Sequence, residues 1–434
     1  MTGQYGGGAF VLVYLLFLVI LGLPVMVMEF SLGRASQSSP VRLYQKLEKP
    51  GQKWHIHGYA ALAANFLLMM FYTSVAGWIL YYFVSFLSGN MTGISNEESE
   101  KLFGNMLASP VITVGFMAVV VVMGFIILSF GLQKGVERVT KYMMIALLLL
   151  MIILTVHSFT LDGAREGLTF YMKPDFSKID SKVVVGAMNQ AFFTLSLGIG
   201  SMAIFGSYIG KERSLMGESI NILLLDTFVA IVAGLIIFPA CFTFDVEPGA
   251  GPGLLFVAMA KVFNNMAGGR WWGSLFFLFM FFAAMSTIVA VFENILACVR
   301  ELSGWGRIKT CIICGSAILF LSLPCALGYN LFSSFVPFAS GSSVLDVEDF
   351  IVSNCMLPLG ALCYVLFCVS KRGWGFENFM TEANSGKGLK VHKWMRYYMT
   401  FVLPVIITAV FVIGILNFPF ADDFTVLGWL KDLC

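Results

Sequence analysis

Charged residues are scarce in this 434-residue sequence. They make up 12% of it, while 58% of the residues are hydrophobic, whereas a soluble protein carries about 25% charged residues. So few charges cannot cover the water-exposed surface of a soluble protein of this size. Most of the chain is therefore expected to face lipid. The net charge is only +2, which gives no argument for nucleic acid as a partner.

Catalytic and metal-binding motifs are missing as well. The four histidines (His55, His57, His157 and His392) fall near the ends of apolar runs or in loops, and neither HExxH nor GxSxG occurs. The nine cysteines lie mostly inside apolar runs and are predicted to be small buried hydrophobic side chains. Cys311 and Cys314 form a CxxC with no second pair. An enzyme is therefore not expected.

Long apolar runs dominate the chain. A helix that crosses a bilayer needs about 20 mostly apolar residues, and ten segments meet this requirement. They are 9–33, 57–88, 111–131, 137–159, 183–210, 216–243, 271–301, 308–328, 348–370 and 394–417. A shorter amphipathic piece near 253–264 is predicted to lie on the membrane or to re-enter it. These runs predict an all-α polytopic membrane protein.

The connections between these runs alternate in charge. Loops 34–56 and 371–393 are basic, whereas loop 89–110 is acidic and loop 329–345 has no basic residue. Because basic loops stay in the cytoplasm, both termini are predicted to lie outside. No basic region precedes the first apolar run, so a signal peptide is not expected. The opening glycines, Gly6 to Gly8, fit either a loop that followed an earlier helix or a short translocated tail.

The fifth run contains an unusual polar and glycine-rich segment, from Gln190 to Gly200. Thr194, Ser196, Gly198 and Gly200 fall together at mid-membrane depth. Unwound backbone is tolerated there only where it lines a cavity, and its freed carbonyls can bind a cation. The alternative is an unbroken helix whose small residues pack against a neighbour.

Asp226 lies inside the apolar run 220–238, with no Lys or Arg in its own span. An Asp at the centre of a bilayer costs roughly 2.5–3.5 kcal/mol on insertion scales, so it needs a partner. A bound cation would serve as one. Protonation of the carboxylate, or a basic residue on another helix, would serve as well.

Two other polar positions occur within apolar runs. Ala283, Ser286 and Thr287 place a carbonyl and two hydroxyls on one helical turn, and such oxygens suit a hard cation. These hydroxyls could equally bond their own helix backbone. Tyr72 lies in mid-span, and its phenol could bind a substrate carboxylate or simply a carbonyl.

Together these segments resemble one family, the neurotransmitter:sodium symporters of the LeuT-type fold. The runs from Gly6 to Phe10, from Gly22 to Pro24 and from Met28 to Arg34 resemble the second helix of that family. The segment from Gln190 to Gly200 resembles its broken sixth helix, and 135–138 and 281–291 also fit. The resemblance covers essentially the whole chain and implies an inverted-repeat bundle with ten spans present.

The resemblance also implies a substrate pocket. Tyr72 matches the tyrosine that binds the substrate carboxylate, and Phe193 matches the aromatic lid above the substrate. The remaining pocket positions are Leu68, Ser196, Ile199, Thr287 and Val291. The apolar side chains among them favour a hydrophobic or aromatic amino acid.

Two sodium sites and two gates follow from the same resemblance. Thr194 and Asp226 match ligands of the first sodium site. The second site is matched by Ala283 (through its carbonyl), Ser286 and Thr287. The gate positions are Asp349 on the outside, and Tyr208 and Glu301 on the inside.

The sequence departs from the family pattern in two places. Many members have Asn where this chain has Asp226, and a carboxylate there would supply the negative charge that animal relatives take from chloride, so chloride is not expected to be required. The broken first helix of the family has no counterpart, since Met1 aligns just beyond its unwound region. The chain is therefore expected to be N-terminally truncated, with both sodium sites incomplete, and its parent to have eleven spans.

The sequence thus predicts a single transmembrane transporter domain over residues 1–434, multi-pass in a bacterial plasma (inner) membrane. Its predicted function is sodium-coupled symport of an amino acid into the cell by alternating access. The alternative is a truncated membrane protein that binds or regulates without transporting.

Overall fold

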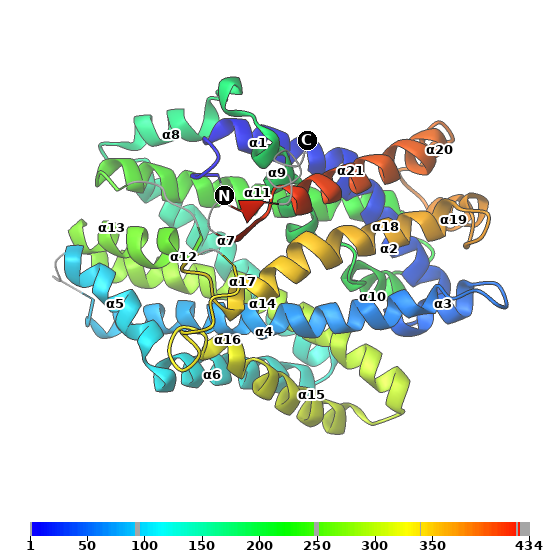
Figure 1. Ribbon diagram of the computed structural model, residues 1–434, viewed down its shortest axis with the longest axis horizontal. Coiled ribbons are helices and arrows are strands. Elements are labelled where there is room, and N and C mark those ends of the chain that lie inside the picture. The colour runs from blue at the N-terminus through cyan, green and yellow to red at the C-terminus, as the bar shows by residue number, and fades with distance from the viewer. Residues whose placement is uncertain (1, 92–95, 247–250, 339, 422–423, 426–434) are drawn as a thin grey trace.

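The protein is a bundle of helices (Figure 1). The computed structural model describes residues 2–91, 96–246, 251–338, 340–421 and 424–425. Within these residues, nine helices are long and apolar enough to cross a membrane. They are Gly8–Ser36, His55–Ser88 (α4), Pro110–Ser129 (α6), Gly135–Ser158, Leu215–Thr243 (α11), Gly269–Ser303 (α14), Arg307–Ala326, Val344–Val369 and Met395–Leu416. The predictions of these nine spans are confirmed.

Several of these spans consist of more than one helical segment. Pro24 lies in the first turn of the segment that follows a π-helical stretch in the first span, where its missing N–H costs least. The segments are α1 (Gly8–Phe17), α2 (Leu23–Ser36), α7 (Arg138–Ser158), α15 (Arg307–Leu321), α16 (Leu323–Ala326), α17 (Val344–Asp349), α18 (Leu357–Val369), α20 (Met395–Tyr397) and α21 (Leu403–Leu416). The π-helical stretches are Leu18–Gly22, Leu132–Glu137, Leu254–Ala258, Phe350–Met356 and Tyr398–Val402.

The tenth predicted span, 183–210, is divided. It consists of α9 (Ser181–Thr194) and α10 (Ser201–Tyr208), with six non-helical residues between them. Neither half is long enough to cross a membrane alone. The break falls within the polar and glycine-rich segment, so the prediction of a broken helix is confirmed and the alternative of an unbroken one is wrong.

Shorter elements connect the spans. The helices among them are α3 (Pro40–Leu47), α5 (Asn96–Ala108), α8 (Ala164–Met172), α12 (Gly251–Gly253), α13 (Met259–Asn265) and α19 (Phe376–Ala383), with a 3₁₀ turn at Phe176–Lys178. The amphipathic piece predicted near 253–264 is the short apolar helix Leu254–Asn265. Two short strands, β1 (Pro419–Ala421) and β2 (Phe424–Thr425), pair antiparallel near the C-terminus. An isolated parallel bridge also joins Arg213 and Lys387, and the other regular elements of the described residues are helical, as predicted.

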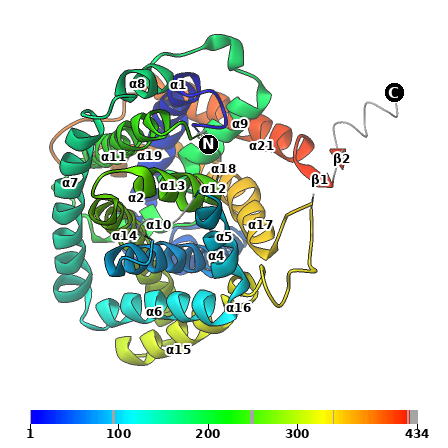
Figure 2. The same cartoon turned by 90° about the vertical axis from the view of Figure 1, so that its left-hand side faces the viewer.

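The spans form inner and outer layers. In their most apolar stretches, the first span, α4 and α14 bury 61%, 56% and 56% of their residues, against 22% in Gly135–Ser158 and Met395–Leu416. The first three therefore make the protein core, and the last two present most of their side chains to lipid. Seen end-on, α2, α4, α10 and α14 lie inward of α6, α7, α15 and α21 (Figure 2). The halves of the broken helix pack against the first span, since α9 contacts α1 and α10 contacts α2.

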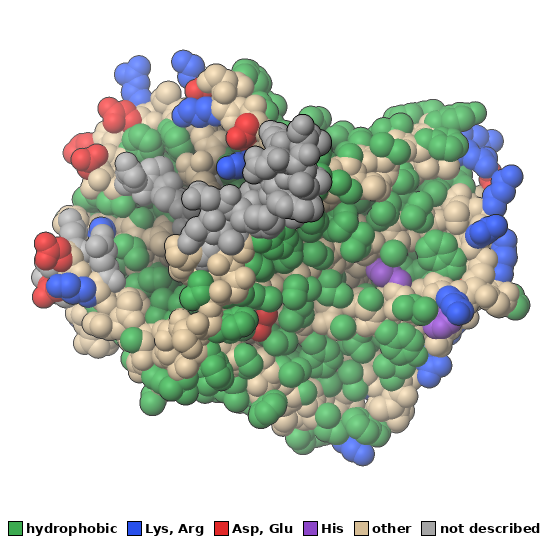
Figure 3. All heavy atoms as spheres, in the orientation of Figure 1, with side chains coloured by type: hydrophobic (Ala, Val, Ile, Leu, Met, Phe, Trp, Pro, Cys, Tyr) green, Lys and Arg blue, Asp and Glu red, His purple; other side chains and the backbone are tan. Residues whose placement is uncertain are grey.

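Lys and Arg side chains gather at one end of the bundle, over α3 and α19 (Figure 3). These helices belong to the two connections that the sequence identified as basic, 34–56 and 371–393. By the positive-inside rule this end faces the cytoplasm. The glycines Gly6, Gly7 and Gly8 lie against Lys178, Phe170 and Lys173 of the connection around α8, away from the basic end. This arrangement agrees with the predicted orientation.

A fully buried arginine ties the cytoplasmic connections to the bundle. Arg34, at the end of α2, is 0% exposed, and its Nε donates to Glu382 Oε1 of α19 at 2.6 Å. Its Nη1 donates to the Arg213 carbonyl at 2.8 Å, and its Nη2 bonds the Glu382 carbonyl and the Ser385 hydroxyl. One guanidinium therefore holds α2, the turn after α10 and α19 together.

We expect Arg34→Leu to destabilise the protein by about 3–5 kcal/mol, because it leaves the Glu382 carboxylate and several carbonyls without their buried partner. The matched control is Arg396→Leu. Arg396 pairs with Glu377 of the same helix α19, but both side chains are largely exposed, so its loss should cost less than about 1 kcal/mol. Thermal unfolding of the two purified variants in detergent checks this, and equal melting temperatures would contradict it.

Candidate functional site at the broken helix

Positive backbone φ angles create the break between α9 and α10. Ser196, Gly198 and Gly200 have φ angles of 49°, 88° and 79°, a region that L-residues other than Gly, Asn and Asp seldom adopt. Gly198 also has no room for a side chain, because a Cβ there would lie 2.2 Å from the Leu357 carbonyl oxygen of α18. The unwound backbone therefore depends on glycine both for its conformation and for its close approach to α18.

Polar side chains from three helices hold the unwound backbone. The Gly198 N–H donates to Glu29 Oε1 of α2 at 2.6 Å. Asn65 Nδ2 of α4 donates to the Ile199 carbonyl at 2.8 Å, and Asn294 Nδ2 of α14 donates to Asn65 Oδ1 at 3.1 Å. Glu29, Asn65 and Asn294 are almost completely buried. These bonds satisfy backbone groups that the helix break leaves without partners.

The sequence analysis did not single out these three side chains. A usable signal existed, because each is an ionisable or amide group within a long apolar run, as Asp226 is. The sequence did not indicate the hydrogen-bond partner of each group, because that partner lies at least 95 positions away in the chain.

Asp226 meets the broken helix directly. The Thr194 hydroxyl, at the last residue of α9, donates to Asp226 Oδ2 of α11 at 3.0 Å. Among the described residues, no Lys or Arg forms a salt bridge with Asp226. An ion pair with a basic residue on another helix, one of the alternatives left open by the sequence, is therefore not found in the described part of the chain. The two residues assigned to the first sodium site do lie together.

Three of the predicted pocket residues, one each from α4, α9 and α14, lie near one another. The Tyr72 and Phe193 rings lie 6.4 Å apart between centroids, tilted by 43°, and the Tyr72 hydroxyl interacts with the Thr287 side chain. Leu68, Ile199 and Val291 are each at most 4% exposed. Ser196 lies on the unwound backbone itself. A phenol beside apolar walls can bind a polar ligand head while its apolar part is buried.

The second predicted cation site shows a different pattern of contacts. Ser286 Oγ and Thr287 Oγ1 both donate to the Ala283 carbonyl of their own helix, at 2.8 and 3.4 Å. This is the backbone bonding within the helix that the sequence analysis gave as the alternative. The three oxygens still lie together on one turn of α14.

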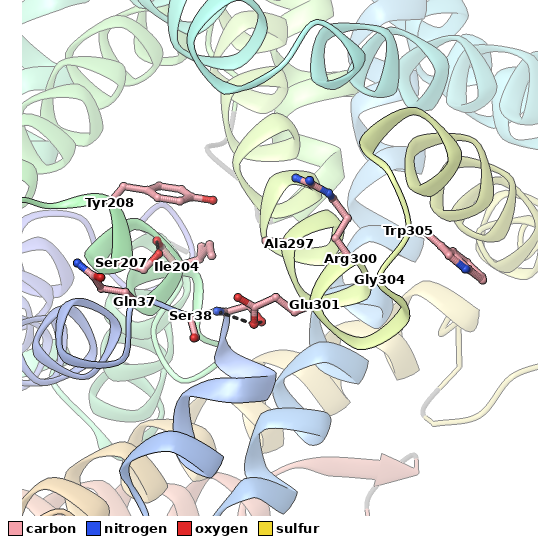
Figure 4. A pocket seen from close by; sticks show the side chains of 11 residues that line it. Gln37, Ser38, Ile204, Ser207, Tyr208, Ala297, Arg300, Glu301, Gly304 and Trp305 are labelled. Carbon is pink, nitrogen blue, oxygen red and sulfur yellow. Dashed lines mark hydrogen bonds between the residues drawn. The ribbon is translucent and has the colours of Figure 1, made fainter.

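The predicted gate residues lie in two separate places. Asp349, at the end of α17, accepts a hydrogen bond from Ser353 Oγ at 2.6 Å. Tyr208 and Glu301 line one open cavity of about 630 Å³ at the basic end. Figure 4 shows Glu301 pointing toward the turn at Ser38, with the Tyr208 ring on the opposite wall. Glu301 Oε2 accepts hydrogen bonds from the Ser39 N–H at 3.1 Å and from the Ser39 hydroxyl at 2.7 Å.

Within the part of the chain that the structure describes, the cysteines and acidic residues form no metal centre of the transition-metal type. Among the described residues, no group of three or more His, Cys, Asp or Glu side chains is arranged to hold a metal ion. Cys311 and Cys314 are free and buried, like most of the eight described cysteines.

Comparison with known proteins gives consistent matches along the chain. Residues 1–100 and 107–430 match the model of the sodium:neurotransmitter symporter family. An uncharacterized sodium-dependent transporter of Bacillus subtilis (strain 168), YhdH, is 36% identical over 96% of this chain and 92% of its own length. The sodium-dependent serotonin transporter of Drosophila melanogaster is 25% identical over 96% of this chain and 72% of its own.

One solved structure matches the fold closely. The crystal structure of MhsT in complex with L-phenylalanine superposes with a TM-score of 0.86 and 35% sequence identity. The match covers 95% of this chain and 93% of that one.

Proposed function

The chain belongs to the sodium:neurotransmitter symporter family of multi-pass membrane transporters, and from that premise we propose that it imports a hydrophobic or aromatic amino acid together with sodium. The contact between Thr194 and Asp226, at the break of the helix that also carries Phe193, is the observation that supports this most strongly. Phe193 and Thr194 are adjacent on the broken helix, so a cation bound between Thr194 and Asp226 of α11 would lie next to the proposed pocket.

The substrate class is inferred from the pocket walls. Leu68, Ile199 and Val291 supply buried apolar surface, and the Phe193 ring faces Tyr72. A substrate carboxylate would accept a hydrogen bond from the Tyr72 phenol, while its side chain would contact the apolar walls. MhsT, whose structure contains L-phenylalanine, supports an aromatic cargo.

Two sodium ions are proposed as co-substrates. Thr194 and Asp226 would hold the first ion, and the Ala283 carbonyl with the Ser286 and Thr287 hydroxyls would contribute to the second. Hydroxyl, carbonyl and carboxylate oxygens are the ligands that hard cations prefer. For the second ion, the two hydroxyls would have to direct their lone pairs toward it while still donating to Ala283.

Transport would proceed by alternating access. Sodium would order the unwound backbone, the amino acid would dock on Tyr72, and Phe193 would close above it. Asp349 would form part of the gate on the outer side. Separation of Glu301 from Ser39, with movement of Tyr208, would then connect the pocket to the inner cavity. The sodium gradient supplies the work, so no covalent step is needed.

Uptake into proteoliposomes tests this function. The protein, expressed with any in-frame codons that precede Met1, should accumulate L-phenylalanine when sodium is high outside, and choline in place of sodium should abolish accumulation. L-lysine and L-glutamate serve as polar controls and should not compete. Binding of L-phenylalanine without accumulation would favour a non-transporting role instead, and competition by L-lysine would contradict the apolar pocket.

We expect uptake to continue when gluconate replaces chloride, with its rate unchanged within about twofold. The Asp226 carboxylate lies 3.0 Å from Thr194, so its fixed negative charge would compensate the first sodium ion without a mobile anion. The measurement is the initial uptake rate at constant sodium in the two anions. A collapse of uptake in gluconate would show that an external anion supplies this charge.

A further inference from the structure

The short helix α3 lies between the inner cavity and the unwound backbone, and its first turn contacts both. Ser39, just before α3, donates both of its hydrogen bonds to Glu301 of α14. The next residue, Pro40, packs on Gly200, where an added Cβ would lie 2.4 Å from the proline ring. The inner gate and the residue that precedes α10 therefore touch consecutive residues of one segment.

A second contact links α3 to the break one turn later. Tyr44 of α3 is fully buried, and its hydroxyl lies 2.7 Å from His57 Nδ1 in the first turn of α4. The Gly198 backbone also lies beside the His57 ring.

Gly198 thereby lies between Glu29 and His57. Its N–H donates to Glu29, and its backbone lies beside the His57 ring. A glycine offers no side chain, so its backbone groups are the only means by which neighbouring helices can set its position through hydrogen bonds. The His57 ring is itself held edge-on by the rings of Tyr44 and Tyr364, at 5.4 and 4.9 Å.

We propose that Tyr44 and His57 are positioning residues that couple the inner gate to the substrate-binding segment. In this view, α3 shifts when the Ser39–Glu301 contacts break. The packing of Pro40 on Gly200, the Tyr44–His57 hydrogen bond and the position of the His57 ring beside Gly198 transmit that shift to residues 195–200. Neither side chain touches cargo. The inference rests on the proposed transport function, because the segment it controls carries the pocket residues Ser196 and Ile199.

A double-mutant cycle tests the coupling without any substrate. The readout is the rate at which a maleimide modifies Ser207→Cys, a cavity-lining position on α10, with the rate of the parent protein subtracted for its native cysteines. Glu301→Gln should raise this rate several-fold by weakening the bonds to Ser39. In a Tyr44→Phe background, that effect should shrink at least threefold, because α3 is already partly released.

Tyr82→Phe is the matched control for the cycle. Tyr82 is also fully buried, lies on α4, and has a hydroxyl without a hydrogen-bond partner among the described residues. The effects of Tyr82→Phe and Glu301→Gln should multiply independently. If Tyr44→Phe and Glu301→Gln also multiply independently, the coupling does not exist and the proposal is overturned. Monodisperse elution of every variant confirms that each is folded before it is labelled.

Substitutions at His57 give a second test that separates positioning from packing. His57→Leu removes the hydrogen bond to Tyr44, whereas His57→Gln keeps a side-chain donor and acceptor. We expect the KM for L-phenylalanine to rise about tenfold in the first variant and to stay within threefold of the parent in the second. Equal KM values in the two variants would contradict hydrogen-bond positioning. If L-phenylalanine is not transported at all, the labelling cycle still decides the coupling by itself.

Discussion

Replacing Asp226 by Ala should reduce sodium-driven uptake of L-phenylalanine by about 100-fold or more. The variant loses the carboxylate that accepts from Thr194 at 3.0 Å and, with it, the negative charge proposed to compensate the first sodium ion. Charge-assisted contacts in a buried site are worth about 1.5–3 kcal/mol each, which corresponds to roughly 10- to 150-fold in affinity. Because the variant loses both the charge and the Thr194 contact, we expect the loss of uptake to lie near the upper end of this range.

Glu218→Ala is the matched control for this variant. Glu218 is also an acidic residue of α11, but it lies in the first turn and pairs with the exposed Arg213 at 2.9 Å. Uptake by the control should stay within twofold of the parent. The initial rate as a function of external sodium is the measurement. An Asp226→Ala variant with an unchanged sodium dependence would show that the cation binds elsewhere.

Gly198→Ala should abolish uptake and lower thermal stability. A non-glycine residue at a φ of 88° costs about 1–2 kcal/mol, and the added methyl would lie 2.2 Å from the Leu357 carbonyl oxygen. That oxygen is backbone, so α18 or the unwound segment has to move. Either movement disturbs the bond from Gly198 to Glu29 and the adjacent pocket residues.

Gly115→Ala on α6 is the control for an added methyl group. A Cβ at Gly115 meets nothing within 4 Å, and alanine is favoured over glycine in a helix by about 0.5–1 kcal/mol. This variant should retain uptake and melt at the same temperature or slightly higher. Melting curves in detergent and uptake into proteoliposomes serve both variants. Normal uptake by Gly198→Ala would show that the unwound backbone tolerates displacement and does not form the site.

The contacts around the break show why the sequence could predict the segment but not its support. Ser196, Gly198 and Gly200 identify the unwound stretch, because glycine at mid-membrane depth is costly in a continuous helix. The hydrogen-bond partners of this backbone include Glu29 of α2 and Asn65 of α4. These residues are so far from the break in the sequence that no periodic sequence pattern links them to it. Only the packing of the helices brings them to the break.

Membrane residence, the number of spans, the orientation of the basic connections and the position of the broken helix follow from composition, hydropathy and local residue types. These properties depend on the free energy of transferring each segment into lipid, and this free energy is set largely by the residues of that segment. Helix packing decides the remaining features. These are the pairing of Thr194 with Asp226, the placement of Gly198 between Glu29 and His57, and the position of α3 between the inner gate and the pocket. Because buried polar groups must find partners wherever the bundle places them, the tertiary structure alone decides which residues form the site.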